Sequence, residues 1–228
     1  MSAGPGPRPR AVALDYNGTL SDDEALLEAI YLEVLGEAGA PIGATAYRAH
    51  LLGLADGDMV REGLRRGGVA EPDEDLCRRV LEARLARYAV AVADAPTVTA
   101  DAAAFVRALA ARLPVAVVSG APRAEIEAGL RAAGLRDAVA VIVAAEDVAR
   151  GKPAPDPYAL AVAQLRRVLP GLEAGDVLAI EDAAAGITAA RAAGLRCASI
   201  VHGIGADLVL HGLSERTAAL AAGTPVGG

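Results

Sequence analysis

Aromatic residues are scarce in this chain of 228 residues, which contains no Trp, one Phe and five Tyr. Aromatic side chains make up only 3% of the sequence, although hydrophobic residues together make up 54%. Because Ala supplies much of this apolar fraction, we expect closely packed helices rather than a β-sandwich. The length suits one large domain, or a core domain with a small insert.

Cysteine and basic residues are also too few for several classes of protein. Cys77 and Cys197 are the only cysteines, and their separation matches no metal-ligand pattern. We therefore expect two buried free thiols in a reducing compartment. The formal net charge of −7 argues against DNA or RNA as a partner, because a phosphate backbone attracts a basic surface.

Long apolar runs are absent as well. No stretch of about 18 uncharged apolar residues is present to span a membrane. The first residues, Met1–Arg10, are rich in Pro and Gly and predict a loose arm rather than a signal peptide. We therefore expect a cytoplasmic protein that does not associate with membranes.

The sequence does contain a series of short apolar runs separated by helical patterns. The runs predict five buried parallel strands, at Ala11–Asp15, Val115–Ser119, Val139–Val143, Val177–Ile180 and Cys197–Val201. Helical patterns lie near Asp101–Arg112, Arg123–Ala133, Asp156–Leu169, Ala183–Ala193 and Leu208–Ala222. This alternation predicts an α/β fold with a doubly wound, Rossmann-like parallel sheet of five strands.

The connection between the first two predicted strands is much longer than a crossover between parallel strands requires. It contains only helical patterns, at Asp22–Gly39, Asp58–Arg66 and Asp73–Val90. We therefore predict a small α-helical cap domain at residues 21–95, inserted into a core domain made of residues 1–20 and 96–228.

Acidic residues follow two of the predicted strands, at the edge where an open parallel sheet binds its ligands. Asp15 ends the first strand, and Asn17 lies two positions later, on the same side of an extended segment. Glu181 and Asp182 follow the fourth strand, where a divalent cation would offset the cost of burying two acids together. Each pattern also has an ordinary explanation, because Asp15 to Gly18 could be a simple turn and Asp182 a helix N-cap.

Lys152 is the only Lys among the 22 basic residues of the chain. Its compact ammonium suits a crowded position between a carboxylate and a phosphoryl group better than the wide, planar guanidinium of Arg. Ser119, Gly120 and Thr19 offer hydroxyl or backbone N–H groups that can hold phosphoryl oxygens, although each could equally be a turn residue. These residue types together indicate phosphoryl transfer.

Four segments of the sequence resemble, in order and spacing, the four motifs of the haloacid dehalogenase superfamily. They are Asp15-Tyr-Asn-Gly-Thr-Leu20, Val118-Ser-Gly120, Gly151-Lys-Pro153 and Ile180-Glu-Asp-Ala-Ala-Ala-Gly186. The position of the predicted cap resembles the subgroup that includes β-phosphoglucomutase and phosphoglycolate phosphatase.

The resemblance implies a role for each residue that matches a motif. Asp15 would be the nucleophile and form an aspartyl-phosphate. Mg²⁺ would be bound by Asp15, the backbone carbonyl of Asn17 and Asp182. Glu181 would be a further ligand or would contact one of the ligands. Thr19, Ser119 and Lys152 would hold the phosphoryl group. The cap would close over the substrate, with the segment from His50 to Met59, including Gly53, facing it.

Asn17 departs from the family pattern, because the phosphatases and mutases usually have Asp at this position. That Asp protonates the leaving oxygen and then activates water, whereas an amide cannot titrate. The missing acid–base contribution is typically about 10²–10⁴-fold. Three outcomes are open: hydrolysis of substrates with good leaving groups, a proton supplied by the cap or the substrate, or ligand binding with slow or no turnover.

We predict a Mg²⁺-dependent phosphatase that acts on a small phosphorylated metabolite, as a monomer or a homodimer. One alternative is a catalytically impaired protein that binds a phosphorylated ligand. Another is a phosphotransferase similar to β-phosphoglucomutase. The mutase is disfavoured because Leu27 and Asp56 occupy the positions that match its cap His and Arg.

Overall fold

The computed structural model describes residues 8–52 and 54–223, so that most of the predicted arm, Met1–Pro7, and Gly53 of the predicted cap segment lie outside it. The chain divides into two compact units. One, here called the core unit, runs to Asp22 and resumes at Val98. The other, the helical unit, is Asp23–Thr97.

The core unit contains one parallel sheet in the order β3-β2-β1-β4-β5-β6. Its strands are β1 (Ala11–Leu14), β2 (Val115–Val118), β3 (Val141–Val143), β4 (Val177–Glu181), β5 (Arg196–Ser199) and β6 (Leu208–Val209). The first four are buried along their whole length, which explains their continuous apolar sequences. The predicted doubly wound parallel sheet is confirmed.

The C-terminal part of the core unit differs from the prediction in two details. β6 makes the sheet six-stranded rather than five-stranded, and its two residues are too few for an apolar period to show in the sequence. The helix predicted near Leu208–Ala222 is α9 (Glu215–Ala221), which begins only after Ser214. Ser214 caps it, because its Oγ accepts a hydrogen bond from the N–H of Thr217 at 3.2 Å.

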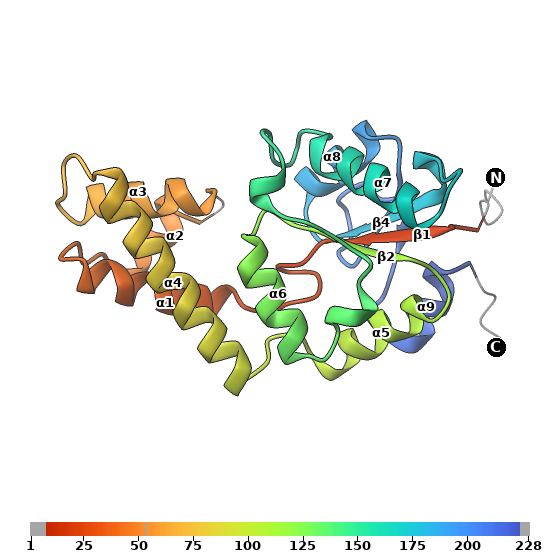
Figure 1. Cartoon of the computed structure of the whole chain (residues 1–228), viewed down its shortest axis with the longest axis horizontal. Helices are drawn as coiled ribbons and strands as arrows, with labels where there is room; N and C mark the ends of the chain where they lie inside the picture. The colour runs from red at the N-terminus through yellow and green to blue at the C-terminus, as the bar shows by residue number, and fades with distance from the viewer. Residues whose placement is uncertain (1–7, 53, 224–228) are drawn as a thin grey trace. The chain divides into compact units, whose positions relative to one another are not determined.

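Helices cover both faces of the sheet, and side chains that alternate along the strands reach both layers (Figure 1). Val12 and Leu14 of β1 face the layer formed by α5 (Ala100–Ala110), α6 (Arg123–Ala132) and α9. Ala11 and Ala13 face the layer formed by α7 (Asp156–Val168) and α8 (Ala184–Ala192). Since both faces are covered, polar groups of the sheet can meet a ligand only at its edges and strand ends.

The helical unit consists of α1 (Glu24–Glu37), α2 (Ala44–His50), α3 (Asp56–Arg66) and α4 (Glu74–Asp94). The sequence predicted three of these helices and missed α2, which has seven residues and buries only Tyr47. So short a helix with one buried residue produces no detectable apolar period.

A buried arginine lies at the centre of the helical unit. Arg84 is 1% exposed, and its guanidinium lies 5.3 Å and 5.6 Å from the ring centroids of Tyr31 and Tyr88. Its Nη1 lies 3.4 Å from Oδ2 of Asp56. Ring faces and a carboxylate therefore compensate a charge that would otherwise be costly to bury.

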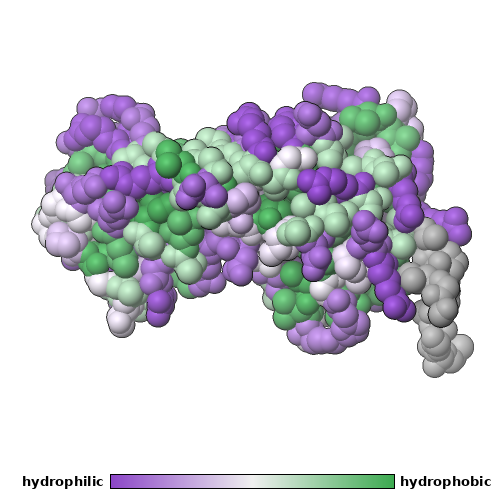
Figure 2. Space-filling model, turned by 90° about the horizontal axis from the view of Figure 1, so that it is seen from below, coloured by the Kyte–Doolittle hydropathy of each residue, from purple (hydrophilic) through white to green (hydrophobic). Residues whose placement is uncertain are grey.

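Cys77 and Cys197 are both buried and free, as predicted. Of the helices in the described ranges, none combines the length and the hydrophobicity that a membrane span requires. On the face drawn in Figure 2, apolar and polar surface are interspersed over both units. A groove in the helical unit lies between α1 and α4 and is lined by Leu26, Ile30 and Val90 among others.

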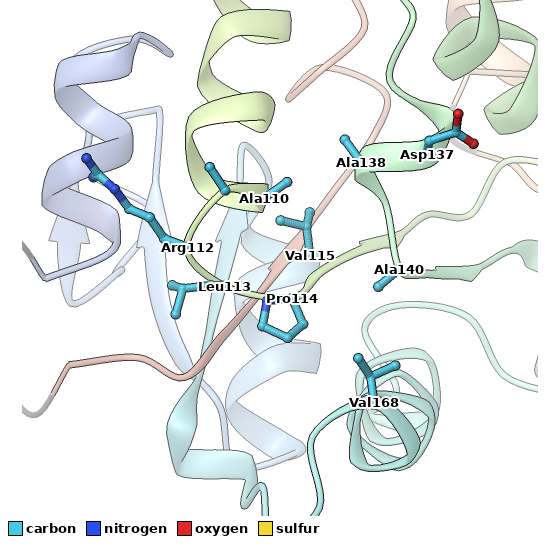
Figure 3. Close-up of a pocket in the computed structure, with 10 residues that line it drawn as sticks. Ala110, Arg112, Leu113, Pro114, Val115, Asp137, Ala138, Ala140 and Val168 are labelled. Atoms are coloured by element: carbon cyan, nitrogen blue, oxygen red, sulfur yellow. The ribbon is translucent and has the colours of Figure 1, made fainter.

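A surface hollow of the core unit lies at the amino end of β2, between Pro114, Val115, Ala138 and Val168 (Figure 3). The two charged residues at its border, Arg112 and Asp137, point apart. This hollow therefore gathers no converging polar groups. It lies at the opposite end of β2 from Ser119.

Candidate active site

Three acids meet at the carboxyl ends of β1 and β4. Asp15 follows β1, Glu181 ends β4, and Asp182 comes next. The two strands pair in parallel with Leu14 opposite Ile180, so the residues that follow them lie side by side. One carboxylate oxygen from each acid lies within 4.8 Å of the others.

Lys152 reaches this cluster from the loop that precedes α7. Its Nζ donates hydrogen bonds to Oδ1 of Asp15 at 2.6 Å, to Oε1 of Glu181 at 2.6 Å and to the carbonyl of Val118 at 2.9 Å. Burial by itself would lower the pKa of Lys152, but the charges of Asp15 and Glu181 raise it above its ordinary value. The lysine is therefore held as an ammonium ion against the predicted nucleophile.

Two acids of the cluster, Glu181 and Asp182, are held in an environment that disfavours their charge. Burial, followed by the charge of Asp15, raises the pKa of Glu181 to about 7 and also raises the pKa of Asp182. The hydroxyl of Tyr158, on α7, donates a hydrogen bond to Glu181. Three carboxylates and one ammonium carry a formal charge of −2. A divalent cation would neutralise this charge, and the hard oxygen donors fit Mg²⁺.

Two glycines of the motifs are required by close packing against these acids. A Cβ atom at Gly186, on α8, would overlap the carboxylate of Glu181. A Cβ atom at Gly18 would overlap Oδ2 of Asp182, and the φ of Gly18 is +80°, which other residues rarely adopt. Both positions therefore exclude larger residues if the acids are to stay where they are.

The side chain of Asn17 is directed to Ser119 and to helix α6. Its Nδ2 donates a hydrogen bond to Oε1 of Glu125 at 2.9 Å, and its Oδ1 accepts one from Oγ of Ser119 at 3.1 Å. Ser119 Oγ in turn accepts a hydrogen bond from the N–H of Ala121 at 3.1 Å. The amide of Asn17 is thus built into a network of side chains next to the acidic cluster.

The remaining predicted residues lie at the same edge of the sheet. Thr19 is buried, with its Oγ1 3.5 Å from Oδ1 of Asp182. Gly120 is exposed directly after Ser119, and a Cβ atom there would meet nothing within 4 Å. The structure therefore brings all eight predicted positions to the carboxyl edge, while their individual roles stay predictions.

The sequence did not indicate two residues that the structure adds to this region, Glu125 and Tyr158. An acid in the first turn of a helix is common, because it interacts favourably with the helix dipole. The available signal was the helical period, which places Glu125 on the same face as the buried Gly129, four residues later. Tyr158 is a buried residue of α7 that resembled an ordinary core aromatic.

Comparison with known protein families identifies a match over the part of the chain that contains these residues. A family model described as haloacid dehalogenase-like hydrolase matches residues 9–194. The chain belongs to the haloacid dehalogenase-like hydrolases. This membership confirms the resemblance based on the four motifs.

Curated relatives of this hydrolase include named phosphatases. The plasmid-encoded protein CbbY of Cupriavidus necator is 34% identical over 203 residues, which cover 82% of this chain and 76% of the relative. The fructose-1-phosphate phosphatase YqaB of Escherichia coli is 31% identical over 181 residues, covering 79% and 90%. Among solved structures, a CbbY variant of Rhodobacter sphaeroides in complex with xylulose-(1,5)bisphosphate matches with a TM-score of 0.76 and 26% identity, covering 91% and 96%.

Proposed function

We propose that this haloacid dehalogenase-like hydrolase is a Mg²⁺-dependent phosphatase that acts on a small phosphorylated metabolite through an aspartyl-phosphate at Asp15. The contact of Lys152 with both Asp15 and Glu181, at 2.6 Å each, is the observation that carries the proposal. An ammonium at this distance from the nucleophile can balance the charge of phosphoryl oxygens that approach it. When bound by Asp15, Asp182 and the carbonyl of Asn17, with Glu181 nearby, Mg²⁺ supplies charge neutralisation for the acids and the phosphoryl group.

The reaction proceeds in two displacements at phosphorus. An oxygen of Asp15 forms a bond to phosphorus while the bond to the leaving oxygen breaks, which gives the aspartyl-phosphate. Water then forms a bond to the same phosphorus atom, and the bond to Asp15 breaks, which releases inorganic phosphate and regenerates the carboxylate. Lys152 balances charge on the phosphoryl oxygens in both steps.

Asn17 limits which leaving groups depart readily. The leaving oxygen gains a proton in the first displacement, and an amide has none to give. The proton must therefore come from water, from another side chain or from the substrate. We accordingly expect acyl and aryl phosphates, whose leaving groups depart without an acid, to be hydrolysed faster than alkyl phosphates.

The relatives suggest phosphorylated sugars as the first metabolites to assay. The Escherichia coli relative is named for fructose 1-phosphate, and the Rhodobacter sphaeroides structure contains xylulose 1,5-bisphosphate. Both compounds, together with 2-phosphoglycolate, form a test panel. Phosphorus NMR of the products distinguishes release of inorganic phosphate from transfer to another position of the sugar, which a mutase would catalyse.

The deciding experiment compares the wild type with Asp15→Asn on acetyl phosphate and p-nitrophenyl phosphate, in Mg²⁺ and in EDTA. We expect phosphate release in Mg²⁺ from the wild type and none above background from Asp15→Asn or in EDTA. The matched control is Asp137→Asn, an exposed acid at the opposite end of the sheet, which should keep wild-type activity. Activity of Asp15→Asn equal to that of the wild type would refute the proposed nucleophile.

Asn17 also favours a second candidate function, the binding of a phosphorylated ligand without turnover. Such a protein would bind phosphate or a sugar phosphate in calorimetric titrations with Mg²⁺ and would leave every compound of the panel intact. Turnover of acetyl phosphate by the wild type, abolished in Asp15→Asn, would exclude this candidate.

A further inference from the structure

The hydrogen bonds around Asn17 define the orientation of its amide. A carboxylate only accepts hydrogen bonds, so the Nδ2 end must face Glu125 and the Oδ1 end must face the hydroxyl of Ser119. In the flipped orientation, the amide oxygen would face the carboxylate with no proton between them. The carboxylate of Glu125 is therefore the group that decides which way Asn17 points.

Glu125 differs from an ordinary acid at the start of a helix. It is 1% exposed, although it lies in the first turn of α6. Glu127, two residues later on the same helix, forms a surface ion pair with Arg131 instead. A carboxylate as buried as Glu125 needs hydrogen-bond donors, and the Asn17 amide is one of them.

We propose that Glu125 is a positioning residue of the active site, which holds the Asn17 amide and makes an amide, rather than a carboxylate, the side chain that fits at position 17. The distance of 2.9 Å between Asn17 Nδ2 and Glu125 Oε1 leaves no room for a donor between them. An ionised Asp at position 17 would place two acceptors against each other at this distance, a contact that only a proton taken up by one of the two carboxyl groups would relieve. The two residues therefore form a matched pair, although 108 positions separate them.

This pairing gives the Asn at position 17 a second explanation. The inference rests on the proposed phosphatase function. An isolated change from Asp to Asn at the acid–base position would only remove a proton donor. Paired with a buried carboxylate, the Asn instead belongs to a different arrangement of the site, in which the side chain at position 17 must offer a donor to Glu125. An Asp at position 17 can take the orientation of the present amide only if residue 125 can donate a hydrogen bond as well.

Five proteins test the pairing: the wild type, Glu125→Gln, Asn17→Asp, the double variant Asn17→Asp/Glu125→Gln, and the double variant Asn17→Asp/Glu127→Gln as the control. Gln keeps the length of Glu and offers both an acceptor and a donor. In the wild-type background its Oε1 still accepts from Asn17, so Glu125→Gln should change Tm little. Asn17→Asp should lower Tm by roughly 5 °C, and the double variant should regain most of that loss. Asn17→Asp/Glu127→Gln should have no higher Tm than Asn17→Asp.

Turnover provides the readout that a merely structural role would not move. For a sugar phosphate in Mg²⁺, kcat of the double variant should exceed that of Asn17→Asp by about tenfold or more, with KM little changed, because the amide at residue 125 then holds the introduced carboxyl group in the orientation of the present Asn17 side chain. Equal Tm values for Asn17→Asp and the wild type, or no rescue by Glu125→Gln in either Tm or kcat, would overturn the pairing. If no protein of the series, the wild type included, hydrolyses any phosphate, the proposed phosphatase function fails, and the Tm comparison alone still decides the pairing.

Discussion

Replacing Lys152 with Met removes the only ammonium from a cluster of three carboxylates while keeping the length of the side chain. The side chains of Lys152 and Glu181 are 14% and 1% exposed, so water compensates little for the loss. Breaking a buried ion pair by removing one partner typically destabilises a protein by about 3–5 kcal/mol. We therefore expect the free energy of unfolding of the metal-free protein to fall by about 3–5 kcal/mol.

Mg²⁺ should reduce this loss, because a divalent cation compensates the same carboxylates that Lys152 contacts. Catalysis should not recover, since the ammonium beside Asp15 Oδ1 is also needed on the phosphoryl group. The loss of one such electrostatic contact typically costs about 10²–10³-fold in kcat. Urea unfolding in EDTA and in Mg²⁺ measures the first effect, and phosphate release from acetyl phosphate measures the second.

Arg150→Met is the matched control for Lys152→Met. Arg150 lies two residues earlier in the same loop and forms a surface pair with Asp156, whose loss should change stability little, because water compensates both charges, and leave kcat unchanged. If Lys152→Met were as stable as this control in EDTA, the cluster would not depend on the ammonium. If it also kept wild-type kcat, Lys152 would have no part in the reaction.

Three further changes test the site and the helical unit. Gly186→Ala should lower Mg²⁺-dependent turnover at least tenfold and destabilise the protein by about 1–3 kcal/mol, because the added Cβ atom would overlap the Glu181 carboxylate. In the control Gly175→Ala the added Cβ atom has no atom within 4 Å, and neither effect is expected. The pKa of Glu181 is raised from 4.5 to about 7, so the contribution of this group to metal-free stability is full below pH 4.5 and is lost as the pH rises from 4.5 to 7, by roughly 3 kcal/mol. The increase in Tm on adding Mg²⁺ should therefore grow from pH 5 to pH 8, and an increase that does not depend on pH would contradict the assignment. In the helical unit, Asp56→Ala removes the carboxylate that lies 3.4 Å from the buried Arg84 guanidinium and should lower the free energy of unfolding by about 3 kcal/mol in urea titrations, with Asp56→Asn intermediate.

Elements with strong local patterns were predictable from the sequence. The first four strands are apolar along their whole length, because helices cover both faces of the sheet, and such runs are visible without knowledge of any contact. The two-residue β6 and the short α2 were not predictable, because their formation depends on what they pack against rather than on a period of their own.

The composition of the acidic cluster was also predictable, for a reason of topology. Parallel strands place their carboxyl ends at one edge, so residues that follow different strands meet there whatever their distance in the sequence. Asp15, Glu181 and Asp182 follow this rule, and Lys152 was indicated by being the only Lys of the chain. The atoms that Lys152 contacts, and the shift in the pKa of Glu181, depend on distances and burial that no sequence pattern contains.

The sequence by itself determined the doubly wound parallel architecture, the family and the residue types at the site, because these follow from local periodicity and from motifs at strand ends. It also showed that Asn17 departs from the family pattern. Only the tertiary structure decided what surrounds that Asn, since the contact with Glu125 joins a turn after β1 to a helix 108 positions away. Hydrogen bonds of this kind depend on the orientation of two side chains that folding brings together. That orientation cannot be inferred from the positions of the two residues in the sequence.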